Sequence, residues 1–274
     1  MIEVESYIKS GNSFPIIVNK NGRKYFVKLR AGMSNKYALL NEWIGNKLGN
    51  QLGIKIQSPV WFESDDKIAT KNTYIEVKEL IEKSLGFNIG FDFKEHITEI
   101  QVDELELCSH KDLIRIFLFD LMMVNVDRTL ANTNLIRFDN TIFSIDYESS
   151  LLVQSIIEDK NFLENSRVLQ CFRNNPLYQE IEENEVNEFL AITHSVSLDL
   201  ILSEIPESLL NKKTFNLLKQ GIEKRKEQDW SLKEILSKLK SLQPENQDEQ
   251  KAKRKMNQAK FKKNLKANAL INRT

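Results

Sequence analysis

Cysteine and histidine are scarce in this sequence. Among 274 residues there are only two cysteines, Cys108 and Cys171, too few for a disulfide framework. That scarcity predicts a reducing, cytoplasmic compartment. The three histidines, His96, His110 and His194, form no pair with the spacing of metal ligands, and neither cysteine has a neighbour at such spacing. The sequence therefore excludes a disulfide-stapled fold and offers no zinc-binding motif.

Long apolar runs and two common enzyme motifs are also absent. No apolar run reaches the ~18 residues of a membrane-spanning helix, and the N-terminal MIEVESYIKSGN is too acidic for a signal peptide. Neither the Gly-x-x-x-x-Gly-Lys-Ser/Thr phosphate loop nor the Gly-x-Ser-x-Gly nucleophile motif occurs. We therefore expect no membrane partner, no P-loop nucleotide hydrolase and no serine hydrolase of that kind.

The first 53 residues predict a β-rich beginning followed by one helix. Residues 2–8 alternate apolar and polar side chains. Two apolar runs flank Asn21-Gly22, which is a strong hairpin signal because both residues accept positive φ. Apolar side chains at helical spacing predict a helix over residues 34–52, which Gly53 ends.

The pattern then changes from strands to helices. Apolar runs at 58–63 and 67–77 predict two more strands, and the mixed polarity of 87–97 indicates a hinge. An apolar helix is expected over 111–124, followed by a short strand at 141–146. The chain beyond residue 151 has helical periodicity almost to its end.

The charge is distributed unevenly, although the net charge is zero. Residues 251–274 hold nine Lys or Arg and no acid, so the other 250 residues carry 30 basic and 39 acidic side chains, a formal charge of −9. Such a segment is either a solvated helix or a binding site for nucleic acid, with Phe261 as its only aromatic residue. We predict an α+β fold with a β-rich lobe over 1–90, a helical lobe over 91–242 and a basic tail over 243–274.

Three polar residues stand where the pattern demands buried elements. Asp127 and Asn132 lie between the apolar helix and the short strand, and Asp146 ends that strand. An uncompensated buried carboxylate costs several kcal/mol, and a bound Mg²⁺ would offset that cost. Asp-x-x-x-x-Asn followed by Asp after a further strand is also the spacing of the phosphoryl-transfer template. The alternative is that these residues only cap helices and form turns.

The N-terminal residues supply the other groups that a kinase needs. Lys28 lies on the predicted strand YFVKLR, on the same face as Lys24 and Phe26, and Glu42 lies within the predicted helix. A lysine on a strand can hold nucleotide phosphates, and a glutamate on a helix can hold that lysine. The turn SGNS, residues 10–13, is placed to cover the phosphates. Each feature also has an ordinary explanation when it is taken singly. Lys28 is then a surface lysine, Glu42 a solvated glutamate and SGNS an ordinary turn.

The order of these motifs resembles the HipA-like kinases, in particular the small branch that lacks the usual N-terminal subdomain. An apolar helix leads into Asn125-Val126-Asp127-Arg128, then Asn132 and Asn134, and a strand ends in Ile145-Asp146. The resemblance extends over about residues 5–155. It implies a two-lobed fold similar to the protein and phosphatidylinositol kinases.

The resemblance also implies a role for each site residue. Asp127 would be the catalytic base, Asn132 and Asp146 the Mg²⁺ ligands, and Lys28 the contact to the ATP phosphates. Glu42 would hold Lys28. The remaining nucleotide-binding residues would be those of the turn, namely Gly11, Asn12 and Ser13.

The sequence departs from the family pattern in two places. Many relatives follow the metal-binding aspartate with His-Gly or His-Ala, whereas Tyr147-Glu148 stands here. The phosphate turn holds a single glycine, Gly11, between Ser10 and Ser13, which are candidate sites of autophosphorylation.

We expect an ATP- and Mg²⁺-dependent kinase that transfers the γ-phosphoryl group to a hydroxyl, namely a Ser or Thr of a protein substrate. The resemblance implies translation-related substrates and an antitoxin-type partner. One alternative is a small-molecule phosphotransferase similar to the aminoglycoside kinases. The other is a non-catalytic nucleotide-binding or scaffold protein whose basic tail binds nucleic acid.

Overall fold

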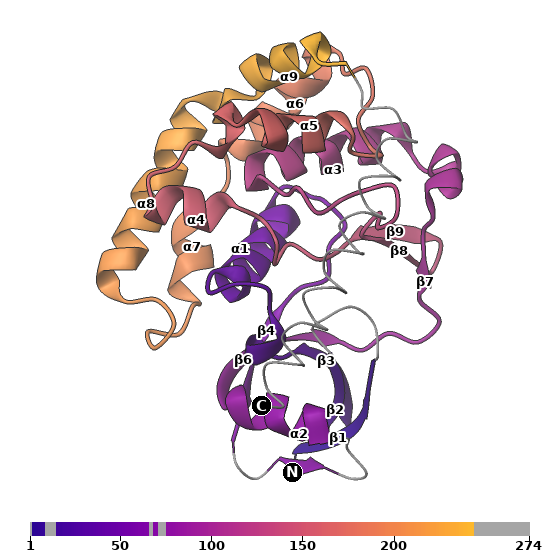
Figure 1. The fold of residues 1–274 in the computed structure, drawn as a ribbon, viewed down its shortest axis with the longest axis vertical. Coiled ribbons are helices and arrows are strands. Elements are labelled where there is room, and N and C mark those ends of the chain that lie inside the picture. Colours follow the sequence, from indigo (N-terminus) through magenta and orange to yellow (C-terminus); the bar gives the residue numbers. More distant parts are fainter. Residues whose placement is uncertain (1, 9–14, 66–67, 71–74, 244–274) are drawn as a thin grey trace, which may run out of the picture.

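A computed structural model describes residues 2–8, 15–65, 68–70 and 75–243 (Figure 1). The N-terminal part is a six-stranded sheet in the order β4-β6-β3-β2-β1-β5, antiparallel except for the β1–β5 pair. Its strands are β1 (Ile2–Tyr7), β2 (Ile16–Lys20), β3 (Arg23–Lys28), β4 (Val60–Ser64), β5 (Ala69–Thr70) and β6 (Gly86–Asp92).

The predicted hairpin at Asn21-Gly22 joins β2 to β3. Both turn residues have positive φ, 55° at Asn21 and 83° at Gly22, as a two-residue turn between twisted strands requires. The β3–β6 register pairs Lys28 with Ile89. Because side chains alternate along a strand, Lys28 shares one face of the sheet with Phe26, as expected from the sequence.

The opposite face of the sheet is covered by a helix, α2 (Ile75–Lys83). Val77 and Ile81 of this helix are buried against Val18 and Val27 of the sheet in a separate small core. The prediction of a strand over 67–77 was wrong at its C-terminal end. Among the described residues of this range, Ala69 and Thr70 form β5, whereas residues 75–77 begin the helix.

The predicted hinge at 87–97 was also wrong in its first half. Strand β6 lies inside the sheet, between β4 and β3. At its centre, a Cβ on Gly90 would lie 3.3 Å from Val60 Cγ2 and 3.5 Å from Phe62 Cβ. Glycine here marks close packing beside β4 rather than a flexible joint.

The rest of the described chain is mostly helical, with one small sheet (Figure 1). That sheet has the order β7-β8-β9 and consists of β7 (Thr98–Glu99), β8 (Leu135–Phe138) and β9 (Thr141–Ser144). The α-helices are α1 (Ala38–Gln51), α3 (His110–Met123), α4 (Leu152–Ile157), α5 (Ser166–Arg173), α6 (Glu183–Thr193), α7 (Leu198–Ser203), α8 (Lys212–Glu227) and α9 (Leu232–Ser241).

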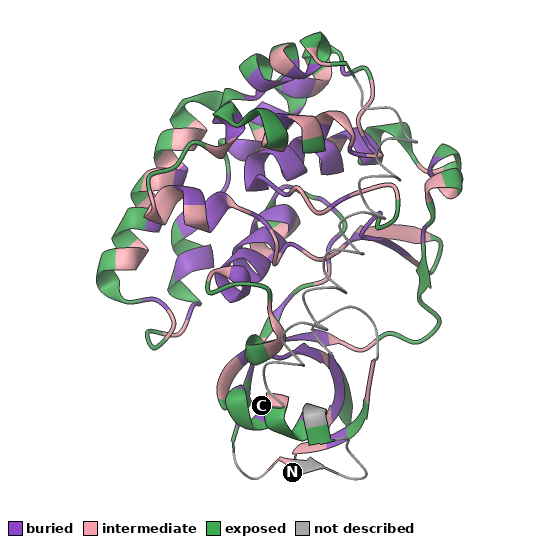
Figure 2. Ribbon diagram, in the orientation of Figure 1, coloured by how far each residue is buried: buried purple, intermediate pink, exposed green. Residues whose placement is uncertain are grey.

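Helix α1 packs with the helical part of the molecule although it lies within the first 90 residues. Its buried Trp43 and Ile44 belong to the same core as Phe119 of α3, and Trp43 Nε1 donates to the carbonyl of Ile201 at 3.1 Å. Figure 2 shows α1 and α3 as the buried centre of this part. The helix therefore links the sheet to the helical core, and the lobe boundary at residue 90 stays a prediction.

Across the described ranges, no helix has both the length and the apolar character needed to cross a bilayer. The predicted basic tail, residues 243–274, lies outside the described residues except for its first position.

Candidate active site

The loop after α3 begins with a sharp change of direction. Val124 has φ 51° and ψ 47°, a left-handed conformation that β-branched residues rarely adopt, and its N–H donates to the carbonyl of Leu121 at 3.2 Å. The chain then runs through Asp127, and Thr129 and Asn132 exchange two backbone hydrogen bonds of 2.8 and 3.0 Å. This tight loop carries the predicted catalytic residues between α3 and β8.

A buried arginine holds the loop in place. Arg128 Nε lies 2.6 Å from Asp120 Oδ2 on α3, and Arg128 Nη2 lies 2.9 Å from Ser144 Oγ on β9. The same guanidinium donates to the carbonyls of Thr133 and Asn134. Both charged side chains of the ion pair are fully buried. No role was predicted for either residue of this pair, although an aspartate inside the apolar run LIRIFLFDLMM was a signal of a buried cation nearby.

Asp127 lies between two amides. Its Oδ2 is 3.5 Å from Asn132 Nδ2 and 3.4 Å from Asn134 Nδ2. Burial raises the pKa of Asp127, and the charge of Asp146 adds to the effect, while the hydrogen bond from Asn134 opposes it. A carboxylate with a raised pKa is a better proton acceptor than an ordinary aspartate.

Asp146 meets Lys28 from the other part of the molecule. Asp146 follows β9 in a left-handed conformation, with φ 67°, and its Oδ1 accepts a hydrogen bond of 2.8 Å from Lys28 Nζ. Glu42 Oε1 lies 3.2 Å from the same ammonium and Glu148 Oε2 lies 3.3 Å from it. Three carboxylates from two separate segments of the chain therefore surround one lysine.

Glu42 ties this cluster to the backbone. Its side chain is almost completely buried, and its Oε2 accepts the N–H of Tyr147 at 2.8 Å. Burial raises the pKa of Glu42 to about 7, against the opposing effect of Lys28. Burial lowers the pKa of Lys28, but the carboxylates of Glu42, Asp146 and Glu148 outweigh it and raise the pKa above that of an ordinary lysine.

The structure thus brings together five of the predicted site residues and says nothing of three others. Lys28, Glu42 and Asp146 are in direct contact, and Asn132 is beside Asp127. The turn residues Gly11, Asn12 and Ser13 lie outside the described residues, as does Ser10. Glu148 was not predicted as a site residue, although an acid two positions after Asp146 was visible in the sequence.

The donor set fits a divalent cation that is held largely by its nucleotide. No group of three or more His, Cys, Asp or Glu side chains in the described ranges is arranged to hold a metal by itself. Mg²⁺ in kinases, however, needs only one or two protein carboxylates and an amide oxygen, together with phosphate oxygens of the nucleotide. Asp146 would provide the carboxylate and Asn132 the amide oxygen. Glu148 Oε2 is a buried oxygen that accepts no hydrogen bond from the described residues, although it lies 3.3 Å from Lys28 Nζ.

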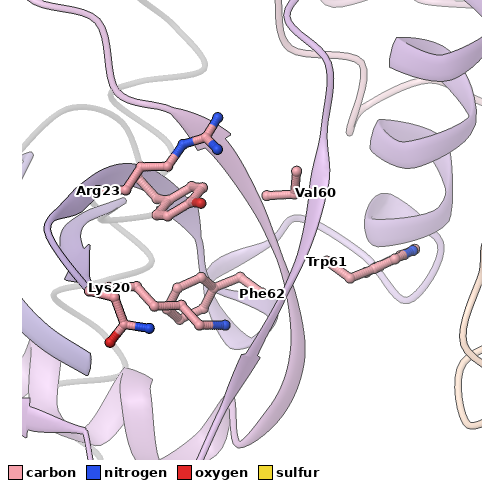
Figure 3. Close-up of a pocket in the computed structure, with 7 residues that line it drawn as sticks. Lys20, Arg23, Val60, Trp61 and Phe62 are labelled. Atoms are coloured by element: carbon pink, nitrogen blue, oxygen red, sulfur yellow. The ribbon is translucent and has the colours of Figure 1, made fainter. Parts of the chain in front are cut away.

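A hollow lies on the face of the N-terminal sheet opposite to that of Lys28. Its volume is about 380 Å³, and Figure 3 shows Lys20, Arg23 and Phe62 among the side chains around it. Arg23 is paired with Asp92 at 2.6 Å, and the Lys20 ammonium lies 5.6 Å from the centre of the Phe62 ring. None of the site residues described above lines this hollow.

Comparisons with known proteins agree with the geometry. The sequence model of the family described as HipA-like kinase matches residues 1–250. No curated protein sequence matches the chain. The crystal structure of a Helicobacter pylori proinflammatory kinase, CtkA, is similar with a TM-score of 0.52 and 16% identity, over 89% of this chain and 97% of that one.

Two further structures are similar at lower scores. One is HipA of Shewanella oneidensis in a complex with HipB and operator DNA (TM-score 0.36, 12% identity, 90% of this chain and 62% of that one). The other is LicA in complex with AMP (TM-score 0.32, 12% identity, 88% and 86%). These scores are too low to support an argument, whereas the family match extends over most of the chain. The chain therefore belongs to the HipA-like kinases and has their mixed α+β, kinase-like fold.

Proposed function

We propose that this kinase uses ATP and Mg²⁺ and transfers the γ-phosphoryl group to the hydroxyl of a protein Ser or Thr. The observation that carries the proposal is the contact of 2.8 Å between Lys28 Nζ and Asp146 Oδ1, two residues 118 positions apart. It joins a strand of the N-terminal sheet to the segment beside the Asp127 loop. Such convergence of a lysine and an aspartate is what phosphate binding beside a metal requires.

Each side chain has a role in this reaction. Lys28 holds the α- and β-phosphates, and Glu42 keeps the Lys28 ammonium in position. Asn132 and Asp146 would hold Mg²⁺, which when bound neutralises charge on the phosphates. Asp127 accepts the proton of the attacking hydroxyl as its oxygen forms a bond to the γ-phosphorus. The bond from that phosphorus to the β–γ bridging oxygen breaks, and ADP leaves.

The acceptor and the partners are proposed on the family relationship. HipA-like kinases are associated with Ser/Thr phosphorylation of translation-related proteins and with antitoxins, and we propose the same class of substrate, an antitoxin-type partner and a cytoplasmic location here. We further propose that the basic tail binds nucleic acid, since its nine cations would release counterions from phosphates.

A phosphate-transfer assay tests the proposal. Wild type, Asp127→Asn and Asp199→Asn are incubated with ATP labelled at the γ-phosphate, with cytosolic proteins and with an aminoglycoside as alternative acceptors. Asp199 is an exposed acid paired with Lys219, so its variant serves as the matched control. We expect transfer to protein by wild type and control, and a loss of about 100-fold or more in Asp127→Asn with ATP binding retained.

Two results would contradict the proposal. Transfer to the aminoglycoside alone would make the chain a small-molecule kinase. Binding of ATP without transfer to any acceptor by the wild type would make it a scaffold.

A further inference from the structure

Glu148 belongs to the group of carboxylates around Lys28, but the proposed reaction does not use it. Its Oε2 lies 3.3 Å from Lys28 Nζ, and its side chain is only 12% exposed. Lys28 already has Glu42 at 3.2 Å and Asp146 at 2.8 Å. Glu42 and Asp146 have roles in the proposed reaction, whereas Glu148 has none.

The position of Glu148 is fixed by the residue before it. Tyr147 is fully buried against Phe119, with ring centres 5.1 Å apart, and its N–H is bound by Glu42. The Tyr147 hydroxyl lies 2.6 Å from Ser144 Oγ. These contacts hold the backbone of this segment, so Glu148 remains beside Lys28.

Glu148 Oε2 makes an incomplete contact. It is close enough to Lys28 for charge attraction, but the oxygen is buried and accepts no hydrogen bond from any described residue. A buried carboxylate oxygen without a hydrogen bond costs free energy, which the attraction to Lys28 offsets. The charge of Glu148 therefore acts on Lys28, the residue proposed to hold the nucleotide phosphates.

Glu148 adds to an excess of negative charge at this site. Among the described residues, Glu42, Asp127, Asp146 and Glu148 contribute four carboxylates, and Lys28 is the cation that contacts three of them. Arg128 is nearby but is paired with Asp120. A triphosphate that arrives without a cation therefore meets an excess of negative charge and a lysine whose neighbours are all carboxylates.

We propose that Glu148 makes nucleotide binding conditional on a divalent cation. Glu148 is a positioning residue that helps to hold the Lys28 ammonium among the carboxylates. A cation that arrives with the nucleotide offsets the charge of these carboxylates, so that Lys28 can contact the phosphates. The inference rests on the proposed function of this site. It goes beyond that function because Glu148 restricts which form of the nucleotide binds rather than taking part in phosphoryl transfer.

Calorimetric titration with adenylyl imidodiphosphate, a non-hydrolysable ATP analogue, tests this inference. The dissociation constant is measured with Mg²⁺ and with EDTA for wild type, Glu148→Gln, Glu148→Asp and Glu234→Gln. Glu234 is an exposed acid of α9 paired with Lys238, so its variant has the same charge change away from the cleft. The measured quantity is the ratio of the two constants, which states how strongly binding depends on Mg²⁺.

We expect the ratio in Glu148→Gln to fall by about tenfold, with tighter binding in EDTA, because one close unit charge has been removed. Glu148→Asp keeps the charge and retains the ratio of the wild type, as does Glu234→Gln. Thermal unfolding verifies that each variant is folded, and we expect Glu148→Gln to melt no lower than wild type.

The failures of the two proposals are distinguishable. Equal ratios for Glu148→Gln and wild type overturn this inference and leave the proposed kinase function intact. An equal fall in Glu148→Asp and Glu148→Gln also overturns it, because shape and not charge would then decide. Absence of nucleotide binding by the wild type with Mg²⁺ overturns the proposed function and this inference with it.

Discussion

At the scale of single residues, Arg128 determines how the Asp127 loop is held. Its guanidinium reaches α3 through Asp120, β9 through Ser144 and the loop itself through two carbonyl groups. Burying this ion pair is favourable only because every charged atom finds a partner. The position of Asp127 therefore depends on Arg128, although Arg128 has no part in the proposed reaction.

The first prediction follows from this burial. In Arg128→Met the carboxylate of Asp120 remains buried without its cation, so we expect a loss of about 3–5 kcal/mol in the free energy of unfolding. Urea denaturation measures it. Removing both charges in Arg128→Met/Asp120→Leu should cost less than Arg128→Met alone. A single variant as stable as wild type would show that the pair does not hold the loop.

At the scale of elements, α1 and the segment after β9 pack closely enough to fix the site. Gly45 of α1 faces Tyr147, and a Cβ on Gly45 would lie 2.7 Å from Tyr147 Cβ and 2.9 Å from its Cγ. Tyr147 separates Asp146 from Glu148. The missing side chain of one helical glycine therefore allows both acids to reach Lys28.

The second prediction concerns this contact. Gly45→Ala should displace Tyr147 and destabilise the protein by about 1–3 kcal/mol, more than the ~1 kcal/mol that alanine gains in a helix. Nucleotide binding should weaken as well. Gly221→Ala on α8 is the control, because its Cβ would lie 2.4 Å from Ile156 Cγ2, away from the site, and should leave nucleotide binding unchanged. Unaltered nucleotide binding in Gly45→Ala would contradict this view of α1.

The third prediction concerns the connection between the start of α1 and the end of α4. Glu158 accepts hydrogen bonds from Lys160, Gln154 and Tyr37, which lower its pKa from 4.5 to about 2. A lowered pKa means that the stabilisation is complete above the pKa of the unfolded chain and disappears as the pH falls toward 2. The stability difference between wild type and Glu158→Gln should therefore shrink between pH 5 and pH 2. A difference independent of pH would exclude these bonds as its source.

At the scale of the whole molecule, features that short stretches of sequence encode were easier to predict than features that depend on tertiary packing. Asn21-Gly22 specified its hairpin because the signal lies within a short stretch of chain. The spacing of Asp127, Asn132 and Asp146 is also local, and their role as a catalytic site stays a prediction. Strand β6 was missed because the reason for its glycine, the neighbouring β4, lies about 30 positions earlier in the sequence.

The site itself shows the same limit. Lys28 and Glu42 were predicted from the groups that a kinase needs on a strand and a helix, whereas Glu148 and Arg128 matter because of partners that only the folded chain supplies. Glu148 lies 120 positions from Lys28, and no periodicity in the sequence connects them. Packing of α1 with both the helical core and the sheet likewise depends on contacts between distant residues, such as Trp43 with the Ile201 carbonyl and with the ring of Trp61.

The central claim is that Lys28, Asp127 and Asp146 converge on one nucleotide and one metal ion between the sheet and the helical core. The most direct test is a crystal structure of the full chain with Mg²⁺ and adenylyl imidodiphosphate. We predict phosphate oxygens beside Lys28, Mg²⁺ between Asn132 and Asp146, and the terminal phosphate facing Asp127. Nucleotide bound elsewhere, for example in the hollow beside Lys20 and Arg23, with this cleft empty, would contradict the account.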